Sequence, residues 1–105
     1  MASVYSTTFA AIHGVDNGTV ITNESENTWI IRDVEVFIGS ESSANLSLVG
    51  AADQTWFFCE SVLSPMSFHW SGRHILAPGD AITVLSDLIE GDAPDLTLCG
   101  YSLTP

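Results

Sequence analysis

Residues 28–39 read TWIIRDVEVFIG, and their pattern is the clearest indication of the fold class. Its second half alternates between two sets of side chains, Val34, Val36 and Ile38 on one face and Asp33, Glu35 and Phe37 on the other. A period of two is the spacing of a β-strand that buries one face. The stretch therefore predicts a long strand with one side against a core.

Similar runs recur about every ten residues, separated by turn residues, a spacing typical of a sandwich or barrel of antiparallel strands. The expected strands cover 4–12, 19–22, 28–39, 45–49, 56–59, 66–70, 73–76, 82–85 and 96–103. We predict an all-β, single-domain antiparallel β-sandwich over residues 1–105, jelly-roll-like, with eight or nine short strands. An immunoglobulin-like sandwich is the alternative, but Trp70 follows Cys59 too closely, and no Tyr stands two residues before Cys99.

Local signals divide the second half of the chain. Pro78, Gly79 and Asp80 follow Ala77 in the pattern of a type II turn, with Pro second and Gly third. Gly72 predicts a bulge or a tight turn. Residues 86–95 read as an acidic loop, with one helical turn conceivable at 87–90. Residues 56–59 are apolar on both faces, which predicts a central strand or a strand against a partner.

The charge balance excludes several classes of partner. The chain has 13 Asp and Glu but only 2 Lys and Arg, and its net charge is −11. Such a surface repels phosphate backbones and anionic membranes, so we expect no nucleic-acid and no membrane partner. A basic protein surface or divalent cations would fit it better.

The density of charge points to self-association. Charged residues make up 14% of the chain, against ~25% in typical soluble domains. Ser, Thr and Gly take their place, and these residues are easier to desolvate than charged ones. We expect a homo-oligomer whose partners cover part of the surface. A monomeric Ser- and Thr-rich β-protein is the alternative.

The N-terminal residues, the cysteines and the Asn-x-Ser/Thr triplets indicate the cell compartment. The first residues show neither a basic nor a long apolar segment, so we expect synthesis as a soluble cytoplasmic chain. Cys59 and Cys99 fall in separate strands, and free thiols are expected rather than a bridge between strands. Asn17, Asn23 and Asn45 begin Asn-x-Ser/Thr triplets, which we interpret as by-products of composition rather than glycan acceptors.

Catalytic templates are missing from the sequence. It contains no Gly-x-Ser-x-Gly elbow, no Gly-x-Gly-x-x-Gly and no P-loop, so we predict no enzymatic activity and no cofactor. His69 and His74 are the best metal candidates, with Asp80 as a conceivable third ligand if Gly72 makes a turn. We expect two ordinary strand histidines, because a catalytic zinc site usually needs three protein ligands.

The remaining candidates are surface residues. The acidic loop could offer oxygens to Ca²⁺ from Asp87, Glu90, Asp92 and Asp95, but a solvated loop is expected. The residues predicted to form an interface are Trp29, Trp56, Phe58, Trp70 and Arg73. A carbohydrate-binding module, with exposed rings stacking on sugars, is the alternative use of these aromatics.

The C-terminal half carries a resemblance. Its pattern is Phe68-x-Trp70-x-Gly72-Arg73-x-Ile75-Leu76-x-Pro78-Gly79-Asp80, then a strand, an acidic loop and Leu98-x-Gly100-Tyr101-x-Leu103. It resembles small β-sandwich virion proteins of tailed bacteriophages, which include capsid decoration, head-tail collar and tail proteins. The resemblance covers about 40 residues and rests mainly on turn and strand chemistry.

The resemblance implies a structural role. It suggests a capsid decoration protein that oligomerises, commonly as a trimer, and docks on the major capsid protein or neighbouring virion proteins. The chain would then reside in the virion after synthesis in the host cytoplasm. A collar or tail protein, or a carbohydrate- or receptor-binding module, remains the alternative.

Overall fold

The computed structural model describes residues 7–50 and 53–104, which form eight strands. In chain order they are β1 (Thr7–Ile12), β2 (Val20–Thr22), β3 (Thr28–Ile38), β4 (Ser43–Val49), β5 (Thr55–Val62), β6 (Met66–Leu76), β7 (Ala81–Glu90) and β8 (Asp95–Leu103). The predicted start of the first strand at residues 4–6 lies outside the described residues. No helix in the described ranges is long and apolar enough to cross a membrane.

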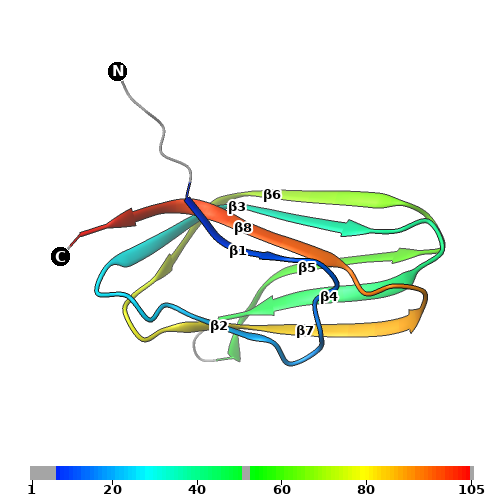
Figure 1. Cartoon of the computed structure of the whole chain (residues 1–105), viewed down its shortest axis with the longest axis horizontal. Coiled ribbons are helices and arrows are strands. Elements are labelled where there is room, and N and C mark those ends of the chain that lie inside the picture. The colour runs from blue at the N-terminus through cyan, green and yellow to red at the C-terminus, as the bar shows by residue number, and fades with distance from the viewer. Residues whose placement is uncertain (1–6, 51–52, 105) are drawn as a thin grey trace, which may run out of the picture.

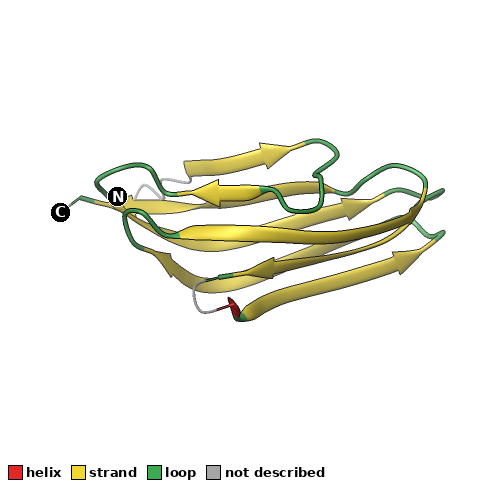
Figure 2. Cartoon of the chain, turned by 90° about the horizontal axis from the view of Figure 1, so that it is seen from below, coloured by secondary structure: helices red, strands yellow, loops and turns green. Residues whose placement is uncertain are grey.

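The strands form two antiparallel sheets of four. Sheet A has the order β1-β8-β3-β6 and sheet B the order β2-β7-β4-β5. Figure 1 shows sheet A above sheet B, and Figure 2 shows the loops gathered at the ends of the strands. Only β4 and β5 form a hairpin, and every other connection passes between the sheets. This strand order is that of an eight-stranded jelly roll, so the predicted fold class is confirmed.

The core lies between the sheets and is aliphatic. Its fully buried side chains come from alternate positions of β3, β4, β7 and β8, among them Val34, Val36, Ile38, Leu46, Leu48, Ile82, Val84, Leu96 and Leu98. Phe57 and Cys59 add to it from β5. The alternation in residues 33–38 therefore identified the buried face of β3 correctly.

The predicted break at Gly72 does not occur. Residues 66–70 and 73–76 belong to one strand, β6, which pairs with β3 along its whole length. Ile31 pairs with His74 and Asp33 with Ser71, so β6 carries one extra residue at this point. The bulge alternative is therefore correct and the tight turn is wrong. The ring of Trp70 lies over Gly72, where a Cβ would stand 2.5 Å from its Cζ2, so glycine is needed for packing there.

The predicted acidic loop is shorter than expected. Strand β7 continues to Glu90 because its second half pairs with the start of β4, for example Asp87 with Asn45. No helical turn forms at 87–90, and only residues 91–94 connect β7 to β8. Inter-strand hydrogen bonds to β4 offset the weak strand propensity of the acidic residues.

Strand β5 is an edge strand and not a central one. The central position predicted for residues 56–59 is therefore wrong, and the prediction of a partner stays open. Trp56 is the extra residue of a bulge, because Leu48 pairs with Phe57 and Val49 with Thr55. The bulge lets Trp56 and Phe57 both pack against the core.

The turn before β7 has the geometry that its sequence indicated. Gly79 has φ = 87°, and the Asp80 N–H donates to the Ala77 carbonyl at 2.9 Å. The Asp80 carboxylate accepts a second bond from the Ala77 N–H at 3.1 Å. Pro78 precedes Gly79, as a type II turn favours.

Candidate interaction surface

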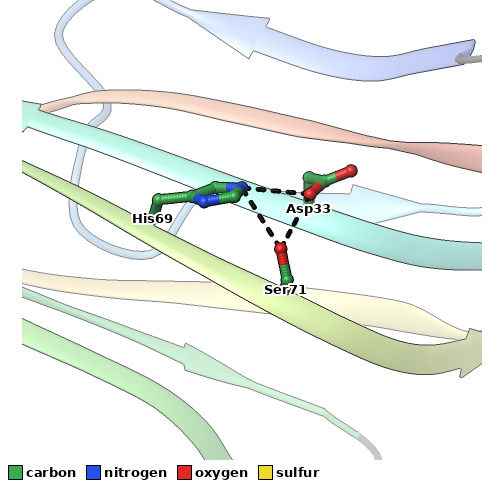
Figure 3. Close-up of polar contacts among 3 residues, drawn as sticks. All are labelled: Asp33, His69 and Ser71. Atoms are coloured by element: carbon green, nitrogen blue, oxygen red, sulfur yellow. Dashed lines mark hydrogen bonds and ion pairs between the residues drawn. The ribbon is translucent and has the colours of Figure 1, made fainter.

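One polar cluster on the outer face of sheet A contains the residue types of a catalytic triad. His69 Nε2 lies 3.0 Å from Asp33 Oδ1, and Ser71 Oγ donates to the same Oδ1 at 3.1 Å (Figure 3). Ser71 Oγ is also 3.4 Å from the same His69 nitrogen. In a working triad the carboxylate and the hydroxyl bind different ring nitrogens. Here one nitrogen faces both groups, so His69 cannot be held by Asp33 while it takes the Ser71 proton.

The same cluster has an ordinary structural explanation. The side chains of His69 and Asp33 are 54% and 45% exposed, and they come from paired strands. Cross-strand polar pairs of this kind contribute up to about 1 kcal/mol to sheet stability. The cluster therefore fixes the pairing of β3 with β6 next to the bulge and does not support nucleophilic catalysis.

The two candidate metal ligands do not meet. His69 lies on the outer face of sheet A, whereas His74 points inward and stacks on Trp56 with ring centroids 4.2 Å apart. Both are on β6, because the strand continues through Gly72. Across residues 7–50 and 53–104, no three His, Cys, Asp or Glu side chains gather closely enough to hold a metal ion.

The four candidate Ca²⁺ ligands of the acidic loop also separate. Asp87 and Glu90 belong to β7, and Asp92 lies in the connection that follows. Asp95 begins β8, where its Oδ1 accepts from the Gly14 N–H at 2.9 Å and lies 2.8 Å from His13 Nδ1. That carboxylate therefore fastens β8 to the loop after β1.

The cysteines are free thiols in different sheets. Burial raises the pKa of Cys59 to about 11, which keeps it protonated and unreactive. Cys99 is half-buried on β8, with its Sγ 3.7 Å from Thr8 Oγ1. The prediction of unpaired cysteines agrees with this arrangement.

Asn23 has a structural role that its Asn-x-Ser triplet did not indicate. It is fully buried, and its amide donates to the carbonyls of Asn27 at 2.8 Å and Leu76 at 2.9 Å. Its Oδ1 accepts from the N–H and the hydroxyl of Ser25, at 3.1 and 2.6 Å. The side chain joins the β2–β3 loop to the end of β6 and cannot accept a glycan in the folded protein.

The tryptophans predicted for the interface lie at the margin of the core. Trp29 stacks on Phe9 at 4.5 Å, and Trp56 packs edge-on against Trp70 at 5.0 Å. All three are half-buried, so their part in an interface remains a prediction. Among the described aromatics, Phe37 and Phe58 are the large exposed ones, and they lie on different sheets. They cannot form one platform for a sugar ring.

Exposed apolar side chains gather instead at one end of the sandwich. The turns after β3, β5 and β7 lie together there, at the right-hand end of Figure 1. Six large hydrophobic side chains that are at least 42% exposed belong to this region: Phe37, Val62, Leu63, Met66, Leu88 and Ile89. We call this set the apolar end. A group of large exposed hydrophobic side chains in one region is typical of interaction sites.

Ser42 holds the apolar end together. It is 3% exposed, its carbonyl accepts from the Leu63 N–H at 3.0 Å, and its hydroxyl accepts from the Asp92 N–H at 2.9 Å. It thus joins the turns after β3, β5 and β7. Gly91, with φ = 86°, passes so close to Glu41 and Ser42 that a Cβ would collide with both. Two hydrogen bonds and close backbone packing therefore join the three turns that carry this surface.

Leu63 has a conformation that few leucines adopt. Its φ is 49°, in the left-handed region, and its side chain is 53% exposed. A bulky residue there costs about 1–2 kcal/mol, and such strain concentrates at functional positions. An exposed leucine in a strained turn adds nothing to the core, which points to a role outside the monomer.

The apolar end has an acidic rim. One shallow hollow brings Glu41 and Glu90 beside Leu63, and a second brings Asp92 beside Phe37. All three carboxylates are exposed. The sequence alone could not find this surface, because its parts come from three turns that are far apart along the chain.

The chain was compared with protein families, curated proteins and solved structures, and it matches none of them. The resemblance to phage virion proteins therefore remains a prediction from the sequence.

Proposed function

We propose that this chain is a non-enzymatic structural subunit that docks on other protein subunits through its apolar end. The observation that carries the proposal is the apolar end itself: six exposed hydrophobic side chains held by a buried serine. Exposed apolar groups on a rigid base suit a protein interface, since ordering them on binding costs little entropy. Phe58, which is 58% exposed on the outer face of sheet B, extends the apolar surface available to neighbours.

The finer proposal is a virion role, with capsid decoration of a tailed bacteriophage first and a collar or tail role second. It is supported by the residue pattern from Phe68 to Leu103 and by the jelly-roll fold. We include self-association as a homo-oligomer, trimeric in the decoration role, and docking on the major capsid protein. A receptor- or carbohydrate-binding module is less favoured, because the tryptophans pack against the core.

Binding to isolated capsids tests the docking proposal. Empty heads are prepared from the phage or prophage whose genome encodes the chain. They are mixed with wild-type protein, with a Leu63→Asp/Ile89→Asp variant or with a Val20→Asp control. Val20 is 56% exposed on β2, outside the apolar end. We expect wild type and control to sediment with the heads and the double variant to lose at least tenfold in affinity.

Electron cryomicroscopy of the same mixtures, and of whole phage particles with necks and tails, tests where the subunit lies. Jelly-roll density on the outer shell supports decoration, and density at the neck or tail supports the alternatives. Equal binding of wild type and the Leu63→Asp/Ile89→Asp variant would contradict docking through the apolar end. Absence of the chain from all particles would contradict the virion role.

A further inference from the structure

We propose that copies of this chain associate through unlike surfaces, the apolar end of one copy docking on an arginine-bearing patch on sheet A of the next. The inference rests on the proposed function, since it names a second copy as one partner of the surface described there. It adds a second surface, on the outer face of sheet A, of which the sequence predicted only Arg73 as an interface residue.

The second surface begins with the two arginines. Arg32 and Arg73 are the only basic residues besides histidine in the sequence, and both are exposed. They stand on paired strands at the same irregularity, between the pairs Ile31–His74 and Asp33–Ser71. Within the residues that the structure describes, neither guanidinium makes an ion pair. A chain of net charge −11 thus keeps its two strong cations together and leaves them available.

Apolar groups lie beside the arginines on the same face. Ile75 is 55% exposed and pairs with Ile30, which pairs on its other side with Tyr101. Leu103, two residues further along β8, is 46% exposed. We define the arginine patch as Arg32, Arg73, Ile75, Tyr101 and Leu103. It combines two positive charges with exposed hydrophobic surface.

The two surfaces complement each other in charge. The apolar end has Glu41, Glu90 and Asp92 at its rim, whereas the arginine patch has two guanidinium groups. Two apolar ends facing each other would bring carboxylates together and repel. An apolar end against an arginine patch pairs apolar with apolar surface and carboxylate with guanidinium, which fixes the choice of partner and its orientation.

One copy cannot make this contact with itself. Met66 is at the apolar end, and Arg73 lies seven residues further along the extended strand β6. At a strand rise of about 3.3 Å per residue, the two are roughly 23 Å apart. The contact is therefore between molecules. Contacts between unlike surfaces close into rings or continue as open chains, depending on the rotation between neighbours.

The test uses two variants that each remove one surface. Arg32→Glu/Arg73→Glu removes the arginine patch, and Leu63→Asp/Ile89→Asp removes the apolar end; all four side chains are exposed. Circular dichroism checks that both variants fold, and light scattering after size exclusion gives their mass. We expect each variant to be a monomer alone, and an equal mixture to form a complex of two chains through the one intact pair of surfaces.

A charge exchange sharpens the test. Glu41→Arg/Glu90→Arg should reduce the association constant at least tenfold, and adding it to Arg32→Glu/Arg73→Glu in the same chain should recover most of the loss. Val20→Asp is the matched control and should associate like wild type. The inference is overturned if wild type is monomeric, if either single-surface variant associates like wild type, or if the mixture stays monomeric. Capsid binding is measured separately, so failure here leaves the docking result to decide the proposed function.

Discussion

The two ends of the sandwich are built in the same way, yet they present opposite surfaces. At one end the buried Asn23 side chain ties the β2–β3 loop to β6, and at the other the buried Ser42 ties together the turns after β3, β5 and β7. Each end thus has one buried polar residue that satisfies backbone groups of several loops.

What differs is the surface that each end shows. At the end with the turns 23–27 and 77–80, the exposed large hydrophobic side chains are Ile75 and Leu103 on the neighbouring strands, whereas the opposite end exposes six, with Leu63 in a turn. The jelly roll therefore does not require apolar residues in its turns. Because the turns at 23–27 and 77–80 close without an exposed hydrophobic side chain of their own, the larger set at the apolar end is better explained by association than by folding.

The largest effect is expected from removing the anchor of the polar end. Asn23→Ala leaves the carbonyls of Asn27 and Leu76 and the N–H of Ser25 without a partner, so we expect a loss of about 3–4 kcal/mol in the free energy of unfolding. Urea denaturation measures it. Asn27→Ala, which removes none of these hydrogen bonds, should change stability by less than about 0.5 kcal/mol.

Substitutions at two glycines with nearly the same φ separate the cost of backbone strain from the cost of steric crowding. Gly91 has φ = 86° and Gly79 has φ = 87°, but a Cβ at Gly91 would collide with Glu41 and Ser42, while one at Gly79 would meet nothing within 4 Å. Gly91→Ala should cost about 2–4 kcal/mol, and Gly79→Ala about 1 kcal/mol. Thermal melts of both variants measure these losses, and equal losses would show that Ser42 and its neighbours can move to make room for a Cβ.

The turn itself gives a further prediction. Gly79→Val should cost more than about 1 kcal/mol, because β-branched residues resist this φ, whereas Asp80→Asn keeps an acceptor for the Ala77 N–H.

Substitutions of Leu63 separate the contribution of this side chain to stability from its contribution to association. Leu63→Gly removes an exposed side chain from a left-handed position, so stability should stay the same or rise by up to about 1 kcal/mol. Capsid binding and self-association should both weaken. Leu63→Ala keeps the strain and loses the same contacts, so its stability should be the lower of the two. A Leu63→Gly protein that is clearly less stable than wild type would assign the leucine a folding role.

The smallest effect concerns pH and His74, which lies two residues before the end of β6 and near the turn at 77–80. Desolvation lowers the pKa of His74 from 6.5, with a partly opposing effect of Asp80. The unfolded chain therefore binds this proton more readily than the folded one. Stability from His74 is complete above about pH 6.5 and is lost as pH falls toward the lowered pKa. In His74→Phe, which keeps a ring against Trp56, the decline in stability from pH 7 to pH 5 should be shallower than in wild type.

The sequence predicted those features that depend on neighbouring residues. The alternation in residues 33–38 gave the buried face of β3, and Pro78-Gly79 gave the turn, because both depend on local geometry. Gly72 was ambiguous because only the ring of Trp70 shows why glycine stands there. The second half of β7 looked like a loop until its pairing with β4 supplied the hydrogen bonds.

Most residues of the two interaction surfaces escaped prediction for a related reason. Ser42 falls between two predicted strands and Asn23 was interpreted only as part of a triplet, because each makes one of its joining hydrogen bonds to a residue 50 or more positions away. Phe58 and Arg73 are exposed as an interface requires, whereas the tryptophans lie against the core. The size and hydrophobicity of a side chain were a poor guide to its exposure, because the bulge in β5 turns Trp56 inward.

Strand β8 lies between β1 and β3 in the middle of sheet A, and it is the last of the eight strands to leave the ribosome. Until then β1 has no partner, since it pairs only with β8, and β3 is paired on one side alone. Loop closure over most of the described residues must precede these contacts, so folding of this domain should be slow and should follow the synthesis of β8. During that interval the nascent chain presents open strand edges, and its abundance in the cell should depend on chaperones that shield them.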